Sequence, residues 1–264
     1  MSEPTVLAPV ALAPTLDLPQ TVARVAEWNL RLAGRPPQEI MALCWTEFGA
    51  AAAISFSGAE DVALIALAAE AGLPLPIFTL DTGRLHGETY RLLEAVRERY
   101  GVTLEVFHPQ AAAVEALTTS KGLFSFYKDG HGECCGIRKV EPLQRALATR
   151  RAWLTGQRRD QSPGTRTDLP VVQVDAAFST PERPLVKFNP LAAWPSQRVW
   201  SYLRAAEVPF NALHERGFVS IGCEPCTRAV LPGQHEREGR WWWEEATHKE
   251  CGLHVAPGPG QADR

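Results

Sequence analysis

Residues 51–72 read AAAISFSGAEDVALIALAAEAG and combine an apolar run, a glycine turn and a helical pattern. The apolar run at 51–56 is typical of a buried strand, because it is short and the polar Ser57-Gly58 turn ends it. Residues 59–71 then place apolar side chains at helical spacing up to Gly72, a residue type that often closes helices. The stretch therefore predicts a strand, a loop and a helix in succession.

The same alternation continues on both sides of this unit. We expect further strands at 76–80, 103–107 and 153–155, and helices at 21–33, 37–48, 87–100 and 194–205. Strands that alternate with helices form mostly parallel sheets that are covered on both faces. The sequence therefore predicts an α/β fold, with a mostly parallel sheet flanked by helices.

Ligands of such sheets bind at the carboxyl ends of the strands, where the loops with Ser57, Asp81 and Gly156 should lie. Residues 55–61 could cradle a phosphate with backbone N–H groups and serine hydroxyls, although a glycine at such a turn is often purely structural. Residues 156–166 read GQRRDQSPGTR and hold three arginines. Arginines on such a loop suit phosphate or sulfate recognition, and a solvated loop is the alternative.

Composition limits the class of protein. The chain has 264 residues, 45% of them hydrophobic, and a formal net charge of -3. Nucleic-acid binders usually carry a global basic field, so this charge argues against nucleic acid as a partner. Residues 1–20 lack the basic start and long apolar run of a signal peptide or membrane span. We therefore expect a cytoplasmic protein without a membrane partner.

Four of the six cysteines form two close pairs, Cys134-Cys135 and Cys223/Cys226. Four thiolates can hold zinc or an iron–sulfur cluster, and buried unligated thiols are the third reading. From the residues alone zinc is the first reading, and the adjacent Cys134-Cys135 pair, which departs from the usual zinc spacing, shifts the interpretation somewhat towards the cluster. Cys44 lies in an apolar helical pattern and is expected in the core.

Cations accompany the remaining candidate residues. Arg138 and Lys139 follow the tandem cysteines at a spacing that places them beside the thiolates if the segment is helical, and a solvated face is the alternative. Pro142 predicts a kink or a new helix that starts near Glu141. Cys251 has basic residues on both sides, which would lower its thiol pKa and make it a nucleophile, unless it is an incidental surface thiol.

Seven short motifs unite these observations: SFSGAED at 55–61, DTG at 81–83, CCGIRKVEPL at 134–143, WLTGQR at 153–158, GCEPCT at 222–227, REGRWW at 237–242 and ECGLH at 250–254. Together they resemble the thioredoxin-dependent assimilatory adenylyl-sulfate reductases. The resemblance spans about residues 51–254, and the cysteine pattern with the ECGLH ending is its most specific part. The Ser57-Gly58 loop alone is shared with the wider ATP pyrophosphatase-like, or adenine nucleotide alpha hydrolase-like, fold.

The resemblance implies roles for individual residues. Cys134, Cys135, Cys223 and Cys226 would bind a [4Fe-4S] cluster, and Cys251 would be the nucleophile. The phosphosulfate would be surrounded by Lys139, Arg166, Arg237, Arg240 and His254. The substrate-binding residues would further include Ser55, Phe56, Ser57, Gly58, Glu60, Asp61, Leu80, Thr82 and Gly156.

The activity that the resemblance implies is reduction of adenosine 5'-phosphosulfate to sulfite and AMP in sulfate assimilation. Cys251 would carry the sulfo group as an S-sulfocysteine, thioredoxin would discharge it, and the cluster would act structurally and electrostatically through Lys139. The expected organisation is a flexible arm at 1–20, a nucleotide-binding α/β domain with the iron–sulfur site at 21–230, and a C-terminal catalytic segment and tail at 231–264. A homo-oligomer is compatible with the sequence, which leaves the oligomeric state open.

Three other functions compete with this one. A phosphoadenylyl-sulfate reductase shares the fold and the nucleophile, but that branch of the family generally lacks the four cluster cysteines. An ATP pyrophosphatase-like ligase or tRNA thiolase would use the loop with Ser57, Gly58 and Asp61 for ATP. A four-cysteine zinc module that binds nucleic acid would be colourless.

Overall fold

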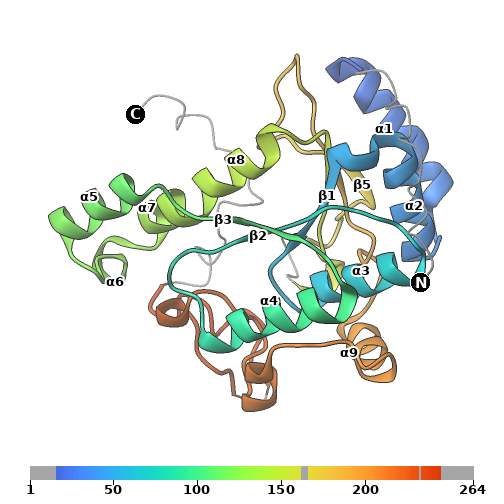
Figure 1. The fold of residues 1–264 in the computed structure, drawn as a ribbon. Coiled ribbons are helices and arrows are strands. Elements are labelled where there is room, and N and C mark those ends of the chain that lie inside the picture. The colour runs from blue at the N-terminus through green and yellow to red at the C-terminus, as the bar shows by residue number, and fades with distance from the viewer. Residues whose placement is uncertain (1–15, 162–165, 232, 245–264) are drawn as a thin grey trace, which may run out of the picture.

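The computed structural model describes residues 16–161, 166–231 and 233–244. Its centre is a six-stranded sheet in the order β3-β2-β1-β4-β6-β5 (Figure 1). The five strands from β3 to β6 run parallel, and β5 pairs antiparallel with β6 at one edge. The strands are β1 (Ala52–Phe56), β2 (Ile77–Leu80), β3 (Leu104–Phe107), β4 (Ala152–Leu154), β5 (Val172–Val174) and β6 (Val186–Phe188). The predicted α/β class and mostly parallel sheet are confirmed.

Helices cover both faces of the sheet. They are α1 (Leu18–Leu32), α2 (Pro37–Phe48), α3 (Ala59–Glu70), α4 (Gly87–Tyr100), α5 (Ala111–Lys121), α6 (Phe126–Asp129), α7 (Gly132–Cys135), α8 (Glu141–Ala148) and α9 (Ser196–Ala205). Apolar side chains of α1, α2, α3, α4 and α9 share one core with the sheet. A second, smaller core lies between the other face and α8.

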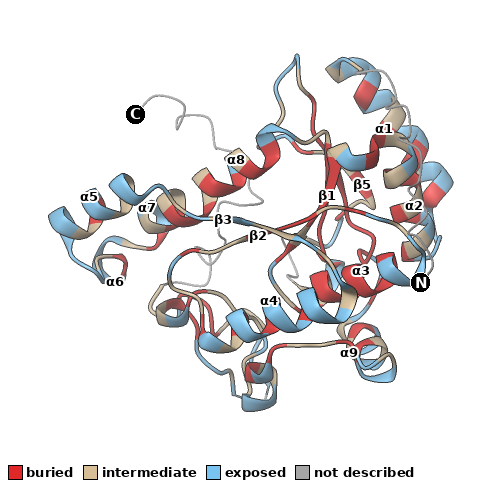
Figure 2. Cartoon of the chain, in the orientation of Figure 1, coloured by how far each residue is buried: buried red, intermediate tan, exposed pale blue. Residues whose placement is uncertain are grey.

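Alternation along the strands explains the two cores. Ile54 of β1 and Leu154 of β4 belong to the larger core, whereas their neighbours Ala53 and Trp153 belong to the smaller one. Successive strand side chains point to opposite faces, so a strand buried on both faces is apolar throughout. Figure 2 shows the result, with β1 and α3 largely buried and α5 largely exposed.

Two parts of the fold differ from the sequence-based expectation. Helix α1 begins at Leu18, three residues before the expected start and inside the expected arm, because Asp17 and Gln20 form a reciprocal capping box. Strands β5 and β6 were not predicted. Each has only three residues, which is too short for a clear periodic signal.

Pro142 marks a helix start, as expected. Helix α8 begins at Glu141 with Pro142 in its first turn, and the preceding Gly136–Val140 is a π-helical turn that follows α7. Turns of this type often occur at functional sites. Figure 1 shows α5, α6 and α7 projecting beyond the edge of the sheet. Nowhere in the described ranges is there a helix that combines the length and the apolar character needed to cross a bilayer.

Candidate active site and cysteine cavity

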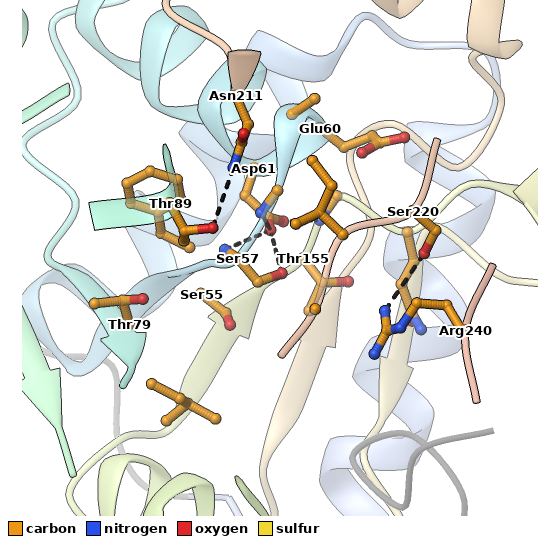
Figure 3. A pocket seen from close by; sticks show the side chains of 18 of the residues that line it. Ser55, Ser57, Glu60, Asp61, Thr79, Thr89, Thr155, Asn211, Ser220 and Arg240 are labelled. Carbon is orange, nitrogen blue, oxygen red and sulfur yellow. Dashed lines mark hydrogen bonds between the residues drawn. The ribbon is translucent and has the colours of Figure 1, made fainter. Parts of the chain in front are cut away.

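A pocket of about 240 Å³ lies at the carboxyl ends of the strands (Figure 3). Every described residue predicted to bind substrate or to support catalysis lines it: Ser55, Phe56, Ser57, Gly58, Glu60, Asp61, Leu80, Thr82, Lys139, Gly156, Arg166, Arg237 and Arg240. These residues come from segments far apart in the sequence. The parallel sheet brings them together, because the loops that follow its strands lie at one edge. Cys251 and His254 lie outside the described residues.

Asp61 organises the loop between β1 and α3. One carboxylate oxygen accepts hydrogen bonds from the Ser57 N–H at 2.8 Å, the Ser57 hydroxyl at 2.8 Å and the Gly58 N–H at 3.0 Å. The other accepts from the Gly156 N–H at 2.8 Å. Burial raises the pKa of Asp61 to about 6, against the opposing hydrogen bonds from Ser57 and Gly156. The Asp61 carboxylate therefore holds the loop in shape, a role distinct from the expected substrate contact.

Gly156 joins the loop after β4 to this region. A Cβ atom at Gly156 would lie 2.4 Å from the Glu60 Cβ and 2.8 Å from an Asp61 oxygen. Contacts this short do not occur between real side chains, so the close approach of the two loops requires glycine. The glycine matters here for space and not for a positive φ angle.

Two predicted binding residues can contribute in only limited ways. Phe56 is 2% exposed and packs in the larger core, so a ligand could reach only its backbone. The Thr82 hydroxyl lies 3.2 Å from the Cys223 sulfur and accepts a hydrogen bond from the Arg84 N–H. Thr82 therefore connects the pocket to the cysteines.

Cations gather on one side of the pocket. Arg240 is buried, with its guanidinium 4.5 Å from the Trp241 ring centroid, and its Nε has no hydrogen-bond partner. Arg166 donates to Gln161 at 2.6 Å, and Lys139 is 8% exposed. Buried or half-buried cations strongly stabilise anionic groups that enter their vicinity.

Only one of the three arginines in the loop at 156–166 is positioned to bind an anion in the pocket. Arg158 is buried and donates to the Glu60 carboxylate at 2.9 and 3.1 Å, with Asp160 as a second partner. Arg159 donates to the Leu169 carbonyl. Of the three arginines expected to recognise phosphate or sulfate, these two are bound within the protein and only Arg166 lines the pocket.

The four predicted ligand cysteines line a second, smaller cavity together with Arg84, Phe126, His131, Arg138, Lys139 and Trp241. No described cysteine forms a disulfide. Among the side chains that the structure describes, no three His, Cys, Asp or Glu groups are arranged to hold a metal ion. The fold thus brings the four cysteines to one cavity but does not hold them in the geometry of a metal site.

The donor set of this cavity fits an anionic sulfur-ligated group. Arg138 and Lys139 are buried against the cysteines, as the helical spacing predicted. Burial opposes ionisation of Cys223, but Lys139 and the Thr82 hydroxyl outweigh it, so the pKa of the Cys223 thiol falls. Burial raises the pKa of the Cys226 thiol to about 12, and repulsion from the negative charge of Cys223 also raises this pKa.

Buried donors of the same cavity also lack partners. They are Nη1 of Arg84, Nε of Arg138 and Nε1 of Trp241. Unpaired buried donors are costly, because they lose their hydrogen bonds to water. An anionic cluster with sulfur acceptors would interact favourably with all three, so the residues present fit the [4Fe-4S] cluster that the sequence motifs imply.

Lys139 and Trp241 line both the pocket and the cysteine cavity. Trp241 stacks on His131 at a centroid distance of 4.2 Å. Glu244 accepts a hydrogen bond from the His131 N–H at 2.8 Å and lies 2.6 Å from its ring Nδ1. These contacts fasten the segment that leads towards Cys251 to the start of the cysteine-bearing helix α7.

Sequence reasoning gave no role to several residues that complete these sites. Arg84, His131 and Trp241 line the cysteine cavity, and Glu236 lines the pocket. Trp241 could have been found from the REGRWW motif. Arg84 and His131 carried no signal, because each stands alone in a loop whose path depends on tertiary packing.

Comparison with known proteins agrees with this arrangement. Residues 51–229 match the family model described as phosphoadenosine phosphosulfate reductase domain. The chain is 58% identical over 247 residues to the adenosine 5'-phosphosulfate reductase of Pseudomonas aeruginosa (strain LESB58), which covers 94% of this chain and 90% of that protein. It is 60% identical over 227 residues to 5'-adenylylsulfate reductase 3, chloroplastic, of Arabidopsis thaliana, over 85% of this chain and 50% of that protein.

A solved structure shares the fold. It is the phosphoadenylyl-sulfate (PAPS) reductase from Candida auris in a phosphate complex, with a TM-score of 0.66 and 26% sequence identity. The match covers 83% of this chain and 100% of the fungal chain.

Proposed function

Because the chain belongs to the phosphoadenosine phosphosulfate reductase domain family, we propose that it reduces adenosine 5'-phosphosulfate to sulfite and AMP in sulfate assimilation. One observation carries the proposal. The predicted nucleotide loop and the cations line a single pocket, and Lys139 connects that pocket to a cavity lined by four cysteines. A relative with 58% identity is named for this activity.

The reaction requires a nucleophile and a way to stabilise negative charge. The Cys251 thiolate attacks the sulfur atom of the sulfo group, the bond from that sulfur to the bridging oxygen breaks, and AMP leaves with the electron pair. Cys251 then carries the sulfo group as an S-sulfocysteine. Lys139, Arg166, Arg237, Arg240 and His254 would stabilise the oxygens as charge builds on them.

A protein dithiol completes the cycle. One thioredoxin thiolate attacks the Cys251 sulfur, and sulfite departs with the electron pair of the sulfur–sulfur bond. The second thioredoxin thiol resolves the mixed disulfide and releases the Cys251 thiolate. Two electrons thus pass from the dithiol to the sulfo group, and thioredoxin ends as a disulfide.

Cys134, Cys135, Cys223 and Cys226 would hold a [4Fe-4S] cluster as one thiolate per iron. When bound, the cluster supplies order and a negative field near Lys139. Lys139 can then position a substrate oxygen from one side while it compensates the thiolates on the other. The electrons of the reaction come from the dithiol, so this arrangement needs no redox change at the cysteines.

The 3'-phosphorylated substrate is a second candidate, because the structural neighbour is a phosphoadenylyl-sulfate reductase. The four-cysteine cavity favours the unphosphorylated substrate. Sulfite release should be measured with anaerobically purified protein and thioredoxin on both nucleotides, together with iron and sulfide content. The proposal expects brown protein, four irons per chain as [4Fe-4S] requires, and strong preference for adenosine 5'-phosphosulfate. Preference for the 3'-phosphorylated form, or one zinc per chain, would contradict it.

A further inference from the structure

An exposed aromatic patch lies beside the cysteine cavity. This aromatic patch consists of Leu123, Phe124, Tyr127 and Trp242. They are four of the ten large apolar side chains that are exposed in the described part of the chain. Phe124 and Tyr127 stack at 6.2 Å between ring centroids, and Tyr127 lies 6.1 Å from Trp242. The patch is therefore continuous, although its members come from the α6 region and from the segment after Arg240.

The patch is firmly held by the protein. The Tyr127 hydroxyl donates to the Pro225 carbonyl at 2.7 Å, between Cys223 and Cys226. Trp243 packs edge-on against Tyr127, with 4.5 Å between ring centroids, and its indole donates to the Phe126 carbonyl at 3.1 Å. A surface that is ordered before it binds loses little conformational entropy on binding, which favours association.

Its chemistry is that of a protein interface. The Arg84 guanidinium lies 5.7 Å from the Phe124 ring centroid, and the Arg228 guanidinium lies 5.1 Å from that of Trp242. A few hot-spot residues carry most of the binding energy in protein interfaces, and Trp, Tyr and Arg are enriched among them. The exposed Val22 and Leu30, by contrast, lie on α1, which Figure 1 shows at the opposite end of the molecule from α6. A contiguous exposed apolar patch usually marks an interaction site.

The position of the patch along the chain identifies the partner. Trp242 precedes Cys251 by nine residues. Nine residues of fully extended chain span at most roughly 30 Å, at ~3.3–3.6 Å per residue. A globular partner of ordinary size that sits on the patch can therefore bring its own reactive group to the Cys251 sulfur. The partner that must reach this sulfur is the dithiol protein of the second half-reaction.

We propose that the aromatic patch is the docking surface for thioredoxin, a proposal that rests on the proposed function. Thioredoxin is a globular protein that carries the dithiol, so contacts with the aromatic patch would increase its affinity for the enzyme. A small dithiol such as dithiothreitol gains no such affinity. The patch would thus act only in discharge of S-sulfocysteine by the protein reductant.

The test uses the full-length iron-loaded protein with a Leu123→Ser/Phe124→Ser double variant and a separate Trp242→Ser variant. Leu30→Ser is the matched control, because Leu30 is 84% exposed on α1. Three quantities are compared: AMP released on mixing with substrate alone, sulfite released by dithiothreitol, and kcat/KM for reduced thioredoxin. We expect only the last to change, with a fall of about 10-fold or more, as loss of interface anchors produces.

Each other outcome has a definite meaning. Unchanged kcat/KM for thioredoxin in both patch variants would overturn the proposal. An equal fall with dithiothreitol would assign the patch to the architecture of the site, and a changed molar mass by light scattering would assign it to a second copy of the chain. Either result also overturns docking of thioredoxin. Failure of the proposed function is distinguishable, because the unmodified protein would then release no AMP.

Discussion

The loop between β1 and α3 and the cysteine cavity differ in how their polar groups are satisfied. In the loop, the Asp61 carboxylate accepts four hydrogen bonds from Ser57, Gly58 and Gly156. In the cavity, buried donors of Arg84, Arg138 and Trp241 lack partners, and cations crowd around thiols. The loop is complete as protein, whereas the cavity has polar groups that the protein alone does not satisfy. Under the proposed function, the loop would be preformed for the nucleotide, and the unsatisfied donors of the cavity would be met by the bound cluster.

The largest effect should come from the cavity. Cys223→Ser should give colourless protein with almost no iron and almost no sulfite production, because three thiolates cannot replace the four that hold the cluster. Nucleotide binding should persist, since the loop has its own hydrogen bonds. Iron analysis and calorimetric titration with AMP would check both.

Cys44→Ala is the matched control for this variant. Cys44 is completely buried in α2 and belongs to the larger core, where its thiol pKa is raised by burial. It should keep its iron and colour. If Cys223→Ser also keeps iron and activity, the cavity is not a ligand site and the contrast between the two regions disappears.

A smaller effect should appear where the two regions meet. Lys139→Ala should lower kcat by about 10²–10³-fold, the usual cost of removing one group that stabilises developing negative charge. Iron content should stay near normal, because Lys139 acts as a charge and not as a ligand. Lys139→Arg, which keeps the charge, should recover part of the rate. Unchanged kcat in Lys139→Ala would show that the two regions act independently.

The smallest of these effects should come from crowding the loop. Gly156→Ala should destabilise the fold by about 1–3 kcal/mol, the cost of an added methyl group in a packed site, and should weaken nucleotide binding while iron is retained. Gly87→Ala is the control. A Cβ there would meet only the flexible end of Arg91, at 3.8 Å. Equal thermal stability of the two variants would contradict the close approach at Gly156.

Sequence predicted those parts of the molecule that local patterns encode. The SFSGAED loop lies between a strand and a helix, and the residues assigned from the motifs line one pocket, because parallel strands place their loops at a common edge. Arg158 shows where such reasoning fails. Its position in an arginine-rich loop suggests an anion site, but the fold pairs it with Glu60, 98 residues away. Strands β5 and β6 and the unsatisfied donors of Arg84 and Arg138 likewise depend on tertiary packing.

In the proposed function, Cys251 carries the sulfo group between two separable half-reactions. The direct measurement is to mix iron-loaded protein with adenosine 5'-phosphosulfate without reductant, quantify AMP, and locate the adduct by peptide mass mapping. We expect about one AMP per active site, a sulfo group on Cys251, and sulfite only after thioredoxin is added. Cys251→Ser should keep its colour and bind nucleotide but form no adduct, because a hydroxyl is a far poorer nucleophile than a thiolate. Sulfite production by Cys251→Ser, or a sulfo group mapped to Cys44 or to a cavity cysteine, would rule out Cys251 as the nucleophile.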